Sequence, residues 1–122
     1  MTLRRTTLGL AIAAGLLGTG HLALTPLLYP GWTLDSLWFV GTGLAMLTGA
    51  GANLLGIGEG GRVRRAGLVL INLAMAAFFA SAWPVLPEPQ VALGGLLFAG
   101  LAACAALFSN IASERGKQNA IG

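Results

Sequence analysis

Four apolar segments, each about as long as a membrane-crossing helix, dominate this sequence of 122 residues. They cover residues 8–29, 37–57, 66–86 and 91–111, and none of them contains Asp, Glu, Lys or Arg. A helix needs roughly 20 apolar residues to cross the hydrocarbon core of a bilayer. The segments therefore predict an all-α integral membrane protein. We expect one domain, 1–122, with four spanning helices and a short polar tail at 112–122.

The composition and the residues between the segments agree with this prediction. Only 9% of the residues are charged, against about 25% in a typical soluble domain. The 19 glycines suit transmembrane helices, which use small residues to pack closely. Prolines and glycines separate the segments, as expected of turns. Asp35, just before the second segment, is the predicted N-cap of the second helix.

The basic residues predict how the chain crosses the membrane. All seven flank the segments at alternate ends: Arg4, Arg5, Arg62, Arg64, Arg65, Arg115 and Lys117. The connections at 30–36 and 87–90 contain no Lys or Arg. By the positive-inside rule we expect an antiparallel, up-down four-helix bundle with both termini cytoplasmic. The protein would then be a multi-pass protein of a bacterial inner membrane, and its basic charge indicates topology rather than nucleic-acid binding.

A short near-repeat links the first two helices. The sequence GTGHLALTP at 18–26 resembles GTGLAMLTG at 41–49, with Leu44 in place of His21. Both copies lie at a similar predicted depth, and we interpret their similarity as chance rather than duplication. The small residues would let the two backbones approach closely. The glycines expected to do this are Gly18, Gly20, Gly41 and Gly43.

Small residues also recur four positions apart on the later helices: Gly41, Ala45 and Gly49, followed by Asn53, on the second; Asn72, Ala76 and Ala80 on the third; and Gly95, Ala99 and Ala103 on the fourth. Such faces suit close contact with other helices. Asn53 and Asn72 lie near the predicted cytoplasmic ends of the second and third helices. We expect their side chains to hydrogen-bond across the bundle.

His21 is the only histidine, and ionisable residues at membrane depth often mark function. Thr25 and Tyr29 follow it at one-turn intervals on the same helix face. Together with Trp38 and Thr42, they could line a pocket, open to the outer leaflet, for a small amphipathic ligand such as a quinone, lipid or pigment. The structural interpretation is the preferred one: His21 would then donate a hydrogen bond to a backbone carbonyl or a threonine of a neighbouring helix.

Cofactor and metal chemistry find less support in the sequence. His21 could ligate haem or (bacterio)chlorophyll, with Met46 as a second axial ligand at a similar depth. No three metal ligands converge, and the single Cys104 excludes an internal disulfide or a CxxC motif. Asp35 would approach His21 only if Pro26 bent the first helix substantially.

No catalytic constellation is visible, and no apolar segment contains the carboxylate that a cation-coupled transporter keeps at membrane depth. We therefore expect a non-catalytic protein rather than an enzyme. Its first expected role is that of an accessory or structural subunit. It would pack against another membrane protein, or in a homo-oligomer, through its Gly/Ala-rich faces. The alternative is a binder or carrier of a small amphipathic ligand around His21.

Overall fold

The computed structural model describes residues 2–57 and 61–119. They form four helices: α1 (Thr2–Leu28), α2 (Leu34–Gly56), α3 (Arg62–Ala82) and α4 (Pro89–Asn119). All four are long and apolar enough to cross a membrane. The prediction of an all-helical chain with four apolar helices is therefore confirmed.

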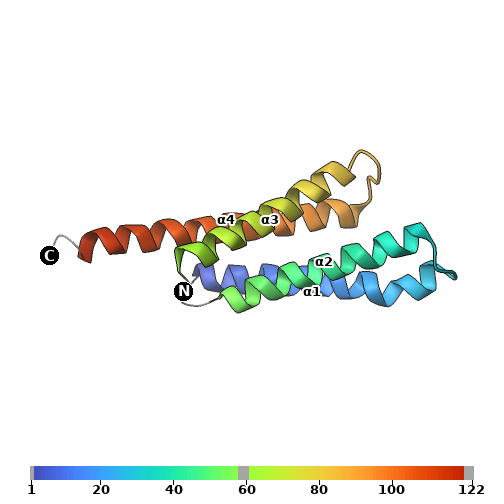
Figure 1. Ribbon diagram of the computed structural model, residues 1–122, viewed down its shortest axis with the longest axis horizontal. Coiled ribbons are helices and arrows are strands. Elements are labelled where there is room, and N and C mark those ends of the chain that lie inside the picture. The colour runs from blue at the N-terminus through green and yellow to red at the C-terminus, as the bar shows by residue number, and fades with distance from the viewer. Residues whose placement is uncertain (1, 58–60, 120–122) are drawn as a thin grey trace.

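The helices form two antiparallel hairpins, α1–α2 and α3–α4, which lie along each other (Figure 1). α1 begins and α4 ends at one end of the bundle, here called the terminal end. The connections 29–33 and 83–88 lie at the opposite end, here called the loop end. Figure 1 shows that the two hairpins diverge toward the loop end.

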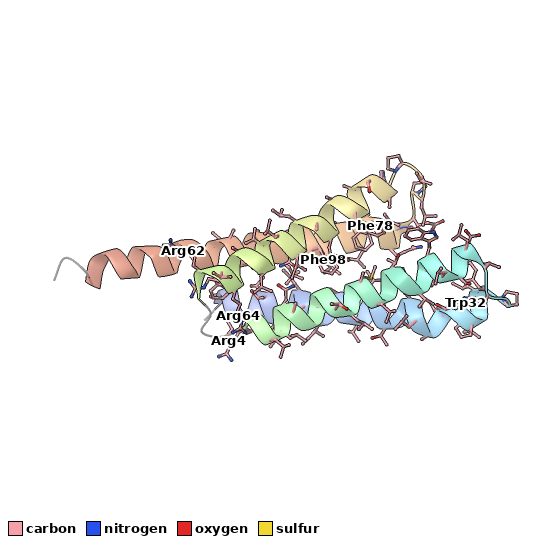
Figure 2. All side chains as sticks on the ribbon, in the orientation of Figure 1. Arg4, Trp32, Arg62, Arg64, Phe78 and Phe98 are labelled. Carbon is pink, nitrogen blue, oxygen red and sulfur yellow. The ribbon has the colours of Figure 1, made fainter. Side chains whose placement is uncertain are left out.

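Basic residues lie toward one end of the bundle and an aromatic residue marks the other. Arg4, Arg62 and Arg64 lie toward the terminal end, whereas Trp32 lies at the loop end (Figure 2). The asymmetry read from the sequence is thus an asymmetry of the folded bundle. This asymmetry would allow the two ends of the bundle to face opposite sides of a membrane.

The helices extend beyond the apolar segments at several points. α4 continues to Asn119, through most of the expected polar tail, because helical hydrogen bonds do not require apolar side chains. α3 ends at Ala82, shortly before Pro84, whose nitrogen has no hydrogen to donate. Pro89 is the first residue of α4, where the missing N–H costs no helical hydrogen bond.

The predicted N-cap of α2 is wrong, because Thr33 rather than Asp35 caps the helix. The Ser36 backbone N–H donates to the Thr33 hydroxyl (3.3 Å), and the Thr33 N–H donates to Ser36 Oγ (2.8 Å). This reciprocal pair satisfies two backbone donors at once. Asp35 lies in the first helical turn instead, where a negative charge interacts favourably with the helix dipole.

α1 and α2 approach closely at one pair of glycines. A Cβ atom at Gly18 would lie 2.8 Å from the Gly43 carbonyl oxygen, and one at Gly43 would lie 3.0 Å from the Gly18 oxygen. The prediction is confirmed for these two glycines and wrong for Gly20 and Gly41, which face open space. Residues two apart on a helix point in different directions, so only one glycine of each pair lies at the contact.

Two asparagines connect the hairpins in the half of the bundle nearer the terminal end. Asn53 Nδ2 donates to Asn72 Oδ1 (2.7 Å), and Asn72 Nδ2 donates to Asn53 Oδ1 (2.9 Å). Asn53 Nδ2 also donates to the Gly49 carbonyl (2.8 Å). Both side chains are buried. The predicted hydrogen bond across the bundle is confirmed, and it joins α2 to α3.

Candidate functional site

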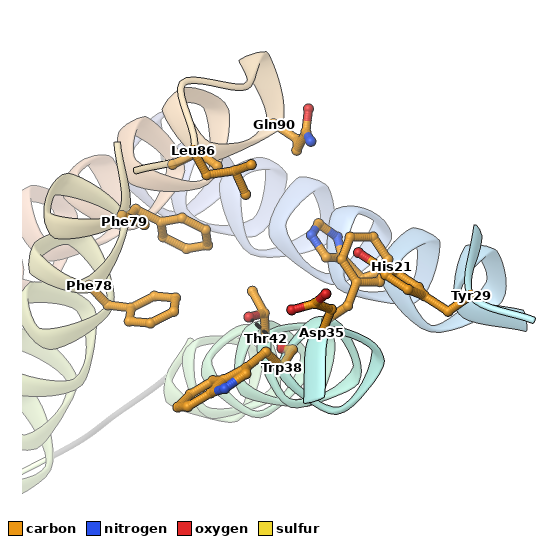
Figure 3. Close-up of a pocket in the computed structure, with 12 residues that line it drawn as sticks. His21, Tyr29, Asp35, Trp38, Thr42, Phe78, Phe79, Leu86 and Gln90 are labelled. Atoms are coloured by element: carbon orange, nitrogen blue, oxygen red, sulfur yellow. Dashed lines mark hydrogen bonds between the residues drawn. The ribbon is translucent and has the colours of Figure 1, made fainter. Parts of the chain in front are cut away.

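A cavity of about 340 Å³ lies at the loop end, between the two hairpins. All four helices and both loop-end connections contribute to its wall (Figure 3). Its lining residues are His21, Tyr29, Asp35, Trp38, Phe39, Thr42, Phe78, Phe79, Ala82, Leu86, Gln90 and Val91. The volume lies at the small end of the range for ligand pockets, roughly 300–1,000 Å³.

Aromatic packing closes the cavity toward the middle of the bundle. Phe79 of α3 lines the cavity and stacks on Phe98 of α4, with ring centroids 6.2 Å apart. Phe98 is fully buried in the core. Gly94 makes room for Phe79, because a Cβ atom there would lie 2.6 Å from the Phe79 ring. Phe79 therefore forms the floor of the cavity, on top of a packed core.

His21 presents one free nitrogen to the cavity. Its side chain is only 8% exposed, and Nδ1 lies 3.0 Å from the Leu17 carbonyl oxygen. Because a carbonyl only accepts hydrogen bonds, Nδ1 carries the hydrogen and the neutral ring has an acceptor at Nε2. Within the described residues, Nε2 has no hydrogen-bond partner. Every fully buried side-chain nitrogen or oxygen in this part of the chain has a partner, so Nε2 is not fully buried. Nε2 is therefore accessible, on a side chain that lines the cavity.

Aromatic contacts hold the imidazole in this orientation. His21 stacks on Phe39 of α2, with ring centroids 4.4 Å apart and an angle of 26° between the planes. The Tyr29 ring lies 5.5 Å from the same Phe39 ring. Figure 3 shows the Tyr29 side chain directed back toward His21. The cavity thus contains a histidine whose position is set by its own helix and by α2.

Four of the five residues predicted to bind a ligand line this one cavity: His21, Tyr29, Trp38 and Thr42. The Thr42 hydroxyl donates to the Trp38 carbonyl oxygen (2.9 Å), so its remaining capacity is that of an acceptor. Thr25 does not line the cavity. Its buried hydroxyl donates to the His21 carbonyl oxygen (2.7 Å), which satisfies it on its own helix.

The proposed second axial ligand lies elsewhere. Met46 is fully buried in the hydrophobic core and does not line the cavity. It packs at the close contact of α1 and α2, where a Cβ atom on Gly18 would lie 2.9 Å from Met46 Cβ. The structure therefore does not bring Met46 and His21 together around the cavity.

Sequence reasoning did not place Asp35 in the pocket. Its side chain lines the cavity, and Figure 3 shows the carboxylate directed toward Phe78 and Phe79. The described residues contain no hydrogen bond between Asp35 and His21. A signal was present nevertheless: Asp35, Trp38, Phe39 and Thr42 follow the spacing of one helix face. The assignment of Asp35 as the cap concealed it.

The α3–α4 side of the cavity had no sequence signal. Phe78, Phe79, Leu86, Gln90 and Val91 line it, yet their positions in the sequence do not distinguish them from other apolar or loop residues. They became neighbours of His21 only through the way the two hairpins pack.

A second hollow lies between α3 and α4. It is an open groove of about 630 Å³, lined mainly by small and apolar side chains. Of the residues predicted to form helix contacts on α3 and α4, Ala76, Ala80, Gly95 and Ala99 lie along it, whereas Asn72 and Ala103 do not. Phe79 and Val91 belong to both linings and so separate the groove from the cavity.

Within residues 2–57 and 61–119, no three His, Cys, Asp or Glu side chains are grouped as a metal site would require. Comparison of the chain with protein-family models, with curated proteins and with solved structures found no match. The chemistry of the cavity is therefore what bears on function.

Proposed function

We propose that the protein binds a small amphipathic molecule in the cavity at the loop end. One observation carries this proposal: a buried histidine with an accessible, unpaired ring nitrogen lines a space bounded by all four helices. Polar groups at membrane depth are costly and are usually paired. A ligand that donates a hydrogen bond to Nε2 would complete the pairing of His21.

The rest of the lining fits such a ligand. The aromatic and aliphatic side chains of the wall would contact an apolar body, while His21, Asp35 and Gln90 offer polar contacts. A purely structural role for His21 requires only the Leu17 hydrogen bond, which the helix provides by itself. That role does not involve Nε2, which stays accessible and unpaired on a residue that lines the cavity. We further propose that the loop end faces away from the cytoplasm, following the positive-inside rule.

Trp38 offers a direct measurement, since it lines the cavity and the other two tryptophans do not. In a Trp32→Phe/Trp83→Phe background in lipid nanodiscs, Trp38 is the only indole. Titrations would use benzyl alcohol, benzyltrimethylammonium and benzenesulfonate, which share a phenyl ring and differ in charge. We expect a saturable change of Trp38 emission with at least one of these compounds.

Two matched variants locate the binding. Ala82→Phe adds a ring inside the cavity, and Ala74→Phe adds the same ring to an exposed position of the same helix. Binding should disappear in Ala82→Phe and persist in Ala74→Phe. The proposal is wrong if no compound saturates, or if binding persists when Ala82→Phe has filled the cavity of a folded protein.

The α3–α4 groove favours a second role, that of an accessory subunit. A transmembrane helix of another membrane protein would fit against its small residues, where backbones approach closely. We expect the protein to leave native membranes in mild detergent as a larger assembly. Ala80→Leu, in the groove, should disperse that assembly, whereas Ala74→Leu should not. Recovery of the wild type as a lone monomer would contradict this role.

A further inference from the structure

The polar side chains that line the cavity offer both donors and acceptors: the Tyr29 hydroxyl, the Trp38 indole N–H and the Gln90 amide can donate. Nε2 of His21 accepts, because the ring hydrogen is used at Nδ1 for the Leu17 carbonyl. The Asp35 carboxylate has only acceptor oxygens when ionised. The Thr42 hydroxyl has already given its hydrogen to the Trp38 carbonyl. His21, Asp35 and Thr42 thus offer acceptors for a ligand, and the lining contains one carboxylate and no Lys or Arg.

The charges around the cavity point the same way. No Lys or Arg occurs in residues 6–61 or 66–114, so every basic side chain is remote in sequence from the loop end. The loop-end segments contain two acids, Asp35 and Glu88. Within the described residues, the Asp35 carboxylate has no ion pair or hydrogen bond. The mouth of the cavity therefore attracts cations and repels anions, and its carboxylate is available to a ligand.

The aromatic side chains add a second attraction for positive charge. The rings of Tyr29, Trp38, Phe39, Phe78 and Phe79 all line the cavity. The face of an aromatic ring carries partial negative charge and attracts ammonium groups, most strongly at tryptophan. Asp35 is an exposed residue that lines the same cavity, with its carboxylate directed toward Phe78 and Phe79 (Figure 3).

From these observations we infer that the ligand is a small lipophilic organic cation, an ammonium group on an apolar body. The ammonium group lies beside the Asp35 carboxylate and the ring of Trp38, and an N–H, where the ligand has one, donates to His21 Nε2. The apolar body lies against Phe79 on the floor. This inference rests on the proposed function, because it names the ligand class of the same cavity.

The experiment compares two ligands of one shape. Benzyltrimethylammonium and neopentylbenzene differ only by a positively charged nitrogen in place of a carbon. Each would be titrated into nanodiscs of neutral lipid that contain the Trp38-only protein. Partitioning of either compound into the lipid is subtracted with the cavity-filled Ala82→Phe protein. We expect the cation to bind about tenfold more tightly than its carbon isostere, or more.

Two carboxylate variants separate the cavity from the general charge of the loop end. Asp35→Asn should weaken binding of the cation about tenfold and leave the neutral isostere unchanged. Glu88→Gln removes the same charge from the same end, at a residue that does not line the cavity. It should change cation binding much less. Circular dichroism, together with unchanged affinity for the neutral isostere, shows whether the Asp35→Asn protein is folded.

The outcomes distinguish the two proposals. If benzyl alcohol or neopentylbenzene binds in the cavity as tightly as the cation, or if Asp35→Asn binds the cation normally, the ligand is not a cation but the cavity still binds ligands. If Asp35→Asn and Glu88→Gln weaken the cation equally, surface charge accounts for the effect and the inference is wrong. If no compound saturates the Trp38 signal, the proposed function itself fails.

Discussion

The two ends of the bundle differ in how completely their buried polar side chains are hydrogen-bonded. In the half nearer the terminal end, Asn53 and Asn72 satisfy each other and join the hairpins. At the loop end, the described residues form no hydrogen bond between the hairpins, which diverge around a cavity containing His21. Where the hairpins meet, the paired asparagine side chains hold them together. His21, whose Nε2 is unpaired, lies where they diverge, which is the expected place for a ligand.

The near-repeat shows the same contrast within one helix pair. His21 is 8% exposed and its counterpart in the second copy, Leu44, is 52% exposed. The imidazole faces the interior and the leucine faces outward, where it would contact lipid. The two positions therefore have different environments despite similar surroundings in the sequence, and the chemistry of each side chain suits its own.

The largest effect is expected at the contact of α1 with α2, on which both ends depend. Gly18→Ala places a Cβ atom 2.8 Å from the Gly43 oxygen and 2.9 Å from Met46 Cβ. These neighbours cannot move unless the helices separate, so we expect a loss of up to about 3 kcal/mol of stability. Gly20→Ala, which meets open space, is the matched control. Stability is measured by SDS titration in mixed micelles, and equal effects of both variants would contradict the packing described.

The next prediction compares two glycines that each face a phenylalanine ring. A Cβ atom would lie 2.8 Å from Phe98 at Gly49 and 2.6 Å from Phe79 at Gly94. Phe98 is locked in the core, whereas Phe79 borders the cavity and has space to move. Gly49→Ala should therefore cost about 1–2 kcal/mol, and Gly94→Ala clearly less, despite its shorter distance. Gly94→Ala should also weaken ligand binding, because the displaced ring enters the cavity.

Removing one asparagine tests the connection between the hairpins. Asn53→Leu leaves the buried Asn72 amide without its partner, so we expect a loss of about 1–2 kcal/mol. Asn53→Leu/Asn72→Leu removes both polar groups and should recover part of that loss. Chemical denaturation of the single and double variants gives the coupling energy. Additive effects of the two substitutions would show that the side chains do not stabilise each other.

The smallest effect is expected at the start of α2, where Thr33 caps the helix and a different residue, Asp35, lines the cavity. Thr33→Val removes the hydroxyl that accepts from Ser36 and should lower stability by about 1 kcal/mol, with ligand affinity unchanged after correction for folding. Asp35→Asn should show the reverse, with little change in stability and weaker cation binding. Parallel denaturation and Trp38 titrations test this. A stability loss at Asp35 as large as that at Thr33 would restore Asp35 as the cap.

Four of the twelve residues that line the cavity were predicted from the sequence. His21, Tyr29, Trp38 and Thr42 lie on α1, α2 and their connection, and a hairpin with a short turn must bring these helices together. Their depths follow from the helical rise. Thr25 shares the helix face of His21 but bonds to its own backbone, a common outcome for threonine in apolar helices. Met46 was predicted at a depth similar to that of His21, but its side chain packs in the core and does not line the cavity.

The spans, their antiparallel order and the separation of charges follow from the sequence alone, because each depends on local composition and on residue order. Which helix faces meet was decided by tertiary packing. In a membrane the lipid is as apolar as the protein core, so a leucine facing lipid and one facing the core look alike in the sequence. The divergence of the hairpins, and with it the meeting of His21 and Asp35 with Phe78, Phe79 and Gln90, exists only in the folded bundle.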